Sequence, residues 1–212
     1  MYTIKKLDSN NISKIYWDDI QEIKIENYPW DQTGYKPKTS VKLCYTDEEL
    51  RVRFTSCEKQ VRVEVNEFNG PSYKDSCVEF FFLPDHKKDD RYFNFEITAK
   101  GNLLLQLGPN GADRHSLDYI NPNYFEIKAD VTSENYRDFD DFKPWNVEYK
   151  IPFEFIKDFF VDFEGKSGHT LKCNFSKCGD KTLTPHYGTW AKIEHYKPAF
   201  HKPEYFNEIV FE

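Results

Sequence analysis

Two glutamates and an asparagine are spaced so that their side chains could form one polar site. Glu79 lies in the run SCVEFFFL, while Asn94 and Glu96 lie in the run RYFNFEIT. Successive side chains of a strand point to opposite faces of its sheet. If the two runs pair as neighbouring strands, these three side chains share one face, where carboxylates and an amide could bind adjacent hydroxyl groups. Strands with one solvated face alternate in the same way, so the pattern is also compatible with an ordinary sheet surface.

The same two carboxyl groups could serve catalysis. A glycoside hydrolase uses two carboxyl groups, one as an acid and the other as a nucleophile or base, and Glu79 with Glu96 could supply them. The sequence does not fix the distance between them, and 36 acidic residues make chance pairs common. Hydrolysis is therefore kept as the alternative to hydrogen bonding of an intact ligand.

Cysteine and histidine residues suggest a third kind of site. Cys173 and Cys178 are followed by His186, His195 and His201. This set lacks the paired histidine spacing of a common zinc finger. The five cysteines are an odd number, which argues against a complete disulfide framework and favours reduced, buried thiols. We expect His186 and His201 to bind backbone groups of the loops around them.

The elements that must position these residues are strands. Aromatic residues make up 17% of the chain, and apolar residues alternate with polar ones wherever the chain is apolar. The pattern predicts an all-β sandwich or barrel with one short helix over Pro152–Phe160. Strands are expected in Val41–Phe54 (two strands around a turn at Thr46–Glu49), Gln60–Val65, Ser76–Leu83, Arg91–Gly108 (two strands), Tyr124–Val131, Trp145–Ile151, Leu171–Cys178 and Glu208–Phe211.

Length and charge exclude several classes of protein. The 212 residues are enough for one domain, predicted to span residues 1–212. With 29 basic against 36 acidic residues the net charge is −7, which argues against a nucleic-acid partner. No apolar run is long enough to cross a bilayer. The opening MYTIKKLDSNN contains no apolar core of a signal peptide, so we expect a cytoplasmic protein.

Five motifs resemble the family 9 carbohydrate-binding module and its stand-alone relatives. They keep their order along most of the chain, from about Val41 to Phe211, and the first and last form the more specific pair. In sequence order they are DSCVEFF (Asp75–Phe81), YFNFEITAKG (Tyr92–Gly101), NFSKCGD (Asn174–Asp180), PHYGTW (Pro185–Trp190) and PAFHKPEYF (Pro198–Phe206).

The resemblance implies a β-sandwich of immunoglobulin-like or jelly-roll character in which two aromatic rings clamp a terminal sugar. Carried over by motif, the rings are Tyr73 and Phe200, at positions that are often Trp in the family. Glu79, Asn94 and Glu96 then occupy the polar positions of the sheet, and Lys177 adds a donor. The resemblance also implies a saccharide ligand, a partner enzyme and calcium ions that stabilise the loops, with no calcium ligands assigned.

The sequence thus predicts non-catalytic carbohydrate binding by a single all-β domain. Two alternatives stay open. One is a small glycoside-processing hydrolase that uses Glu79 and Glu96. The other is an intracellular interaction domain that keeps the fold and has lost sugar binding.

Overall fold

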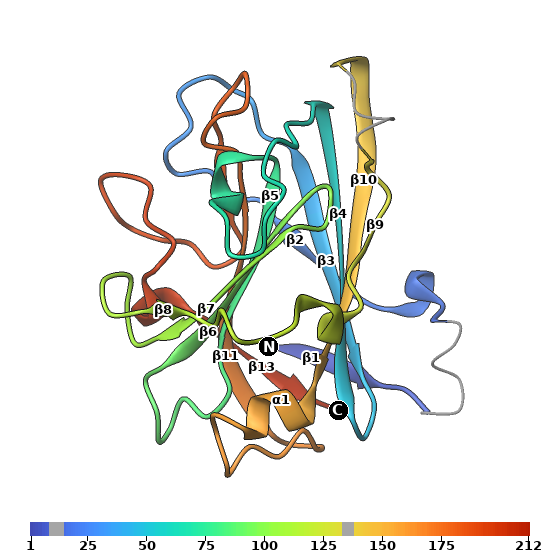
Figure 1. Cartoon of the computed structure of the whole chain (residues 1–212), viewed down its shortest axis with the longest axis vertical. Helices are drawn as coiled ribbons and strands as arrows, with labels where there is room; N and C mark the ends of the chain where they lie inside the picture. The colour runs from blue at the N-terminus through green and yellow to red at the C-terminus, as the bar shows by residue number, and fades with distance from the viewer. Residues whose placement is uncertain (9–14, 133–137) are drawn as a thin grey trace.

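The strands form a curled sheet that folds back on itself into two packed layers (Figure 1). The computed structural model describes residues 1–8, 15–132 and 138–212. Along the sheet the order is β8-β7-β6-β5-β11-β13-β1-β3-β4-β10-β9, with β12 added beside β11 and β2 beside β3. The expected all-β sandwich is therefore confirmed.

The first layer contains the strands on the left of Figure 1 and the second layer those on the right. The first is built from β5 (Cys77–Leu83), β6 (Tyr92–Thr98), β7 (Leu103–Gly108), β8 (His115–Ser116), β11 (Thr170–Cys178), β12 (Tyr187–Thr189) and β13 (Asn207–Phe211). The second is built from β2 (Glu22–Ile25), β3 (Lys38–Tyr45), β4 (Glu49–Gln60), β9 (Lys128–Ala129) and β10 (Asp138–Pro152).

Strand β1 (Tyr2–Lys6) joins the two layers. Its first half pairs in parallel with β13, and its second half pairs in parallel with β3. The sandwich is thereby continuous at this edge, because the first and last strands of the chain lie side by side.

Helical structure is sparse in the described residues. The α-helix α1 (Phe153–Lys157) follows Pro152, as expected, but it is shorter than the predicted Pro152–Phe160. Its apolar side chains join the core at one end of the sandwich (Figure 1). Single 3-10 turns are η2 (Trp17–Asp19), η3 (Ser72–Lys74), η4 (Pro122–Phe125) and η5 (Pro203–Tyr205). No helix in the described part of the chain is long and apolar enough to span a membrane.

Aromatic rings fill the space between the layers. The Phe175 ring of β11 stacks on Phe80 of β5 at 4.7 Å between centroids and meets Phe54 of β4, in the other layer, at 6.0 Å. Every residue of β5 and of β6 is buried, on both faces of the layer. The inner face is covered by the other layer. The outer face is covered by loops, and the candidate site lies there.

One predicted strand does not form, and another is much shorter than expected. Residues 61–65 follow the end of β4 without forming a strand, because their amides bind side chains instead of a neighbouring strand: Val65 N donates to Asp75 Oδ2 at 2.7 Å. In 124–131 only Lys128–Ala129 pairs with β10, since η4 occupies the start of the range and Glu126 has a positive φ of 46°. The strands β1, β2, β8 and β12 lie outside every predicted range.

Candidate functional site

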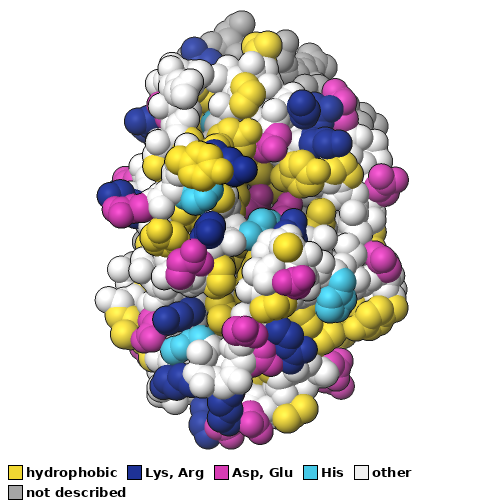
Figure 2. Space-filling view, turned by 90° about the vertical axis from the view of Figure 1, so that its left-hand side faces the viewer, with side chains coloured by type: hydrophobic (Ala, Val, Ile, Leu, Met, Phe, Trp, Pro, Cys, Tyr) yellow, Lys and Arg dark blue, Asp and Glu magenta, His cyan; other side chains and the backbone are white. Residues whose placement is uncertain are grey.

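A pocket of about 280 Å³ lies on the outer face of the first layer. Figure 2 views the molecule from this side and shows acidic side chains at the bottom of a hollow with hydrophobic side chains around it. The strands supply the floor of the pocket and the C-terminal loops supply its walls. The lining residues are Tyr73, Glu79, Glu96, Arg114, Cys178, Asp180, Tyr187, Pro198, Ala199, Phe200 and His201.

The floor carries the two predicted glutamates. Glu79 of β5 lies directly opposite Glu96 of β6 in the antiparallel ladder, so both side chains are on the same face. Their side chains are almost fully buried, with 2% and 3% exposure. Asn94 donates through Nδ2 to Glu96 Oε1 at 2.9 Å and to Gln106 Oε1 at 3.1 Å. Asn94 therefore orients Glu96 from beside the pocket.

These carboxyl groups are short of partners. Glu79 Oε1 accepts a hydrogen bond from the Cys178 thiol at 3.1 Å. The second oxygen of Glu79 and that of Glu96 are buried without a hydrogen-bond partner, and so is Asn94 Oδ1. Burial raises the pKa of Glu96 to about 7, because the charged form loses water. Burial, Cys178 and the neighbouring Glu96 raise the pKa of Glu79 well above its usual value.

Aromatic rings stand above this floor. Tyr73, in η3, is 40% exposed, and its backbone oxygen accepts from Asp180 N at 3.0 Å, which ties η3 to the loop after β11. Phe200 lies in the segment before η5 and contacts the rings of Trp30 and Tyr187 at 5.9 and 6.3 Å. The two predicted clamp residues thus line the same pocket as the glutamates.

His201 fixes the segment that carries Phe200. Its ring stacks on Phe81 of β5 at 4.7 Å between centroids, and its Nδ1 is 2.9 Å from the Tyr92 hydroxyl. Burial, aided by Arg114, lowers the pKa of His201 to about 3, so its ring is neutral at neutral pH. The outward side chains of β5 and β6 therefore hold one wall of the pocket in place.

Two charged residues complete the lining. Arg114 donates from Nε to Gln106 Oε1 at 2.5 Å and lowers the pKa of the nearby Glu96, opposing the larger effect of burial. Asp180 is hydrogen-bonded to Tyr187, and burial raises the pKa of this carboxyl group. The sequence did not identify Arg114 or Asp180 as site residues. Asp180 and its partner Tyr187 do lie within motifs singled out in the sequence.

Lys177 lies apart from the pocket. It projects from β11 toward the other layer, where Nζ is 3.3 Å from Glu58 Oε1 and 2.8 Å from His186 Nε2. Trp145 Nε1 donates to the second oxygen of Glu58 at 2.8 Å. The structure thus brings Tyr73, Glu79, Glu96 and Phe200 together, places Asn94 beside them, and separates Lys177 from them.

The described residues contain one group of side chains with the spacing of metal ligands. One ligand atom from each of Cys77, Glu79 and Cys178 lies within 4.8 Å of the others, all buried. Two thiols suit zinc or another soft metal, whereas calcium takes six to eight oxygen ligands. This set shares only Cys178 with the zinc set considered from the sequence. Calcium in the loops stays a prediction.

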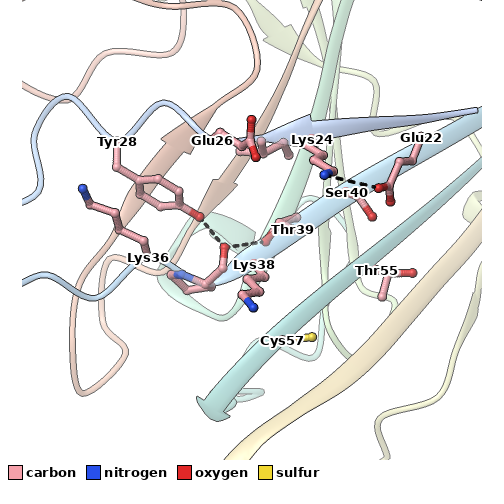
Figure 3. Close-up of a pocket in the computed structure, with 12 residues that line it drawn as sticks. Glu22, Lys24, Glu26, Tyr28, Lys36, Lys38, Thr39, Ser40, Thr55 and Cys57 are labelled. Atoms are coloured by element: carbon pink, nitrogen blue, oxygen red, sulfur yellow. Dashed lines mark hydrogen bonds and ion pairs between the residues drawn. The ribbon is translucent and has the colours of Figure 1, made fainter.

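A larger depression, of about 480 Å³, lies on the second layer over β2, β3 and β4. Figure 3 shows the side chains around it. Tyr28 is its one aromatic ring and donates its hydroxyl to Pro37 O at 2.6 Å, while Lys24 pairs with Glu22 at 3.8 Å. None of its lining residues has a buried polar atom without a partner. The pocket on the first layer is better equipped to bind a polar ligand.

The sequence and the fold are similar to those of known carbohydrate-binding proteins. The family model of carbohydrate-binding family 9 matches residues 9–211. A crystal structure of a putative carbohydrate-binding protein from Bacteroides uniformis ATCC 8492 has 30% sequence identity and a TM-score of 0.84, covering 99% of this chain and 98% of that one. No curated protein matches the chain.

Two more distant structures share the fold. Both are family 9 carbohydrate-binding modules from Caldicellulosiruptor kristjanssonii. The complex with cellotriose has 12% identity and a TM-score of 0.62, with 100% of this chain and 94% of that one covered. The complex with glucose has 13% identity and a TM-score of 0.61, with 100% and 95% covered.

Proposed function

The chain belongs to carbohydrate-binding family 9, and from this membership we propose that it binds the end of a saccharide without cleaving it. Tyr73 and Phe200 cover the faces of the sugar ring, while Glu79 and Glu96 bind its hydroxyl groups. A pyranose has apolar C–H faces and a rim of hydroxyls, so rings above a polar floor match it. The observation that carries the proposal is the convergence of two rings and two unsatisfied carboxyl groups in one pocket.

The arrangement of the carboxyl groups favours binding over hydrolysis. Glu79 and Glu96 are cross-strand neighbours on the same floor, so both approach a ligand from one side. Glycoside hydrolases place their two carboxyl groups on either side of the bond they cleave. Neutral carboxyl groups can donate as well as accept hydrogen bonds, which suits hydroxyl groups that do both.

Thermal unfolding in the presence of mono- and oligosaccharides, glucose and cellotriose among them, tests the proposal. A ligand at a hundred times its Kd stabilises the folded state by about 2.7 kcal/mol, which gives a measurable rise in Tm. Tyr73→Ala should abolish or weaken the shift. Tyr119→Ala is the matched control, because Tyr119 is 74% exposed and does not line the pocket. A flat screen over all saccharides would favour the interaction-domain alternative, and release of products from a glycan would favour the hydrolase.

A further inference from the structure

The polar groups of the pocket are unbalanced in charge. Three carboxyl groups line it, Glu79, Glu96 and Asp180, and Arg114 is the one cation among the lining residues. His201 contributes no positive charge at neutral pH, because burial holds its pKa at about 3. If all three carboxyl groups were ionised, the pocket would carry an excess of two negative charges, and burial opposes this by raising the pKa of each group. A positively charged ligand would correct this imbalance.

The unmatched atoms of the floor are acceptors. Glu79 Oε2 and Glu96 Oε2 are buried and lack donors, and so does Asn94 Oδ1 beside the pocket. Arg114 already donates to Gln106 and to the backbone oxygen of Gly111. An ionised carboxylate only accepts hydrogen bonds, and a hydroxyl brings it one donor. An ammonium group brings three donors and a charge, and it needs no acceptor in return.

The walls suit the same group. Tyr73, Tyr187 and Phe200 line the pocket around the acidic floor. The face of an aromatic ring attracts a cation, and the attraction is stronger where water is excluded. Rings and carboxylates together therefore recognise a ligand that has apolar C–H faces and also a positive charge.

We propose that the pocket selects an amino sugar with a free ammonium group, held between the carboxylates of Glu79 and Glu96. This inference rests on the proposed function and narrows its ligand class from saccharides in general to hexosamines whose nitrogen is not acylated. The ammonium supplies the hydrogen-bond donors and the positive charge that the two adjacent carboxyl groups lack.

Charged and titratable groups surround the pair, and Arg114 is the one cation among those that line the pocket. The surrounding groups are Tyr73, Cys77, Tyr92, Arg114, Cys178, Asp180, Tyr187 and His201.

Isothermal titration calorimetry with three matched sugars tests the inference. D-Glucosamine carries an ammonium, D-glucose carries a hydroxyl at the same position, and N-acetyl-D-glucosamine carries an uncharged nitrogen. At pH 6.5 we expect glucosamine to bind at least tenfold more tightly than either of the others.

The outcomes separate this inference from the proposed function. Equal affinities for the three sugars, or tightest binding of the acetylated sugar, would overturn the inference and leave saccharide binding in place. If no saccharide binds, both fail. Cyclohexylamine tests whether charge alone is recognised: binding as tight as that of glucosamine would overturn the role of the sugar hydroxyls, while much weaker binding supports an amino sugar.

Variants of the two glutamates test whether the ammonium group binds between them. Glu79→Gln and Glu96→Gln keep the shape of the side chain and remove its charge, so each should weaken glucosamine binding about tenfold and glucose binding far less. Glu22→Gln is the control, because Glu22 lies on the second layer outside this pocket. Equal losses for glucosamine and glucose in both pocket variants would contradict the placement of the ammonium.

Discussion

Lys177 Nζ and Glu58 Oε1 lie 3.3 Å apart between the two layers, and neither side chain is exposed to solvent. The lysine comes from β11 and the glutamate from β4, so this ion pair joins the layer that forms the pocket floor to the layer behind it. Trp145 and Ser76 also donate to Glu58, at 2.8 and 3.2 Å. The pair is thus a polar contact that links the two layers inside a core of otherwise mainly hydrophobic side chains.

Removing one partner of this pair should be costly. Lys177→Met leaves Glu58 charged and buried, and breaking a buried pair in this way costs about 3–5 kcal/mol. We expect a loss of this size in the free energy of unfolding measured with urea. Adding Glu58→Gln to the same variant should recover part of the loss, because the remaining side chain is then uncharged.

A surface pair provides the comparison. Lys24 lies 3.8 Å from Glu22, and both side chains are largely exposed. Lys24→Met should therefore change the free energy of unfolding by less than about 1 kcal/mol. Similar effects of Lys177→Met and Lys24→Met would show that the buried pair contributes nothing special.

The raised pKa of Glu96 makes stability depend on pH. In the folded state this pKa is about 7, against a usual value of 4.5, so the folded state binds the proton more tightly. Stability contributed by this group is complete below about pH 4.5 and is lost as the pH rises through 7. Glu96→Gln cannot ionise, so it should gain stability over the wild type as the pH rises from 4.5 to 8, by on the order of 3 kcal/mol at most.

An exposed glutamate should behave in the opposite way. The ion pair with Lys150 lowers the pKa of Glu126, so its contribution to stability is present above the usual pKa and lost in acid. Glu126→Gln should therefore lose stability relative to the wild type as the pH rises. Urea unfolding at about pH 3, 4.5 and 8 measures both variants, since the Glu126 contribution changes below pH 4.5 and that of Glu96 above it. A Glu96→Gln curve parallel to the wild type would contradict the burial argument.

A larger ring at the exposed clamp position should strengthen binding. Tyr73 is 40% exposed, so Tyr73→Trp has room to adopt its rotamer without displacing the core. An aromatic contact is worth about 0.5–1.5 kcal/mol, so a gain of roughly two- to twelvefold in affinity is expected. Calorimetry with the best saccharide from the thermal screen measures it, with Tyr119→Trp as control. Unchanged affinity in Tyr73→Trp would place the sugar away from this ring.

His201 should act through the position of Phe200. His201→Ala removes the ring that stacks on Phe81 and the contact with Tyr92, so the wall should loosen and affinity should fall at least tenfold. His201→Phe keeps the stacking and loses the hydrogen bond, so its affinity should lie between those of the wild type and the alanine variant. Wild-type affinity in His201→Ala would show that the wall is held by other contacts.

The floor of the pocket could be predicted because it depends on local periodicity. Alternation within two runs placed Glu79 and Glu96 on one face, and their pairing as neighbouring strands followed. The same alternation places Lys177 and Cys178 on opposite faces of their strand. Phe175, two residues before Lys177, points into the core. The motif resemblance assigns Lys177 to the ligand. Its position two residues after Phe175 instead puts it on the face of the strand that points into the core.

The walls could not be predicted in the same way. Arg114 and Asp180 lie in segments without a repeating pattern, and they reach the pocket through loop geometry. Glu58 reaches Lys177 only because the two layers pack together. The run Gln60–Val65 also shows the limit of local pattern. It alternates like a strand, but its backbone amides bind the side chains of Asp75 and Ser76.

The parallel pairing of β1 with β13 has a consequence for folding kinetics. The wall segment from Pro198 to His201 lies just before β13, and β13 is held between β1 and β11. Contacts between distant parts of a chain form slowly, since a large loop must close before they are made. During synthesis the acidic floor is complete long before the strand that secures its wall. Ligand-binding competence should therefore emerge in the slowest refolding phase, after the core rings have become buried.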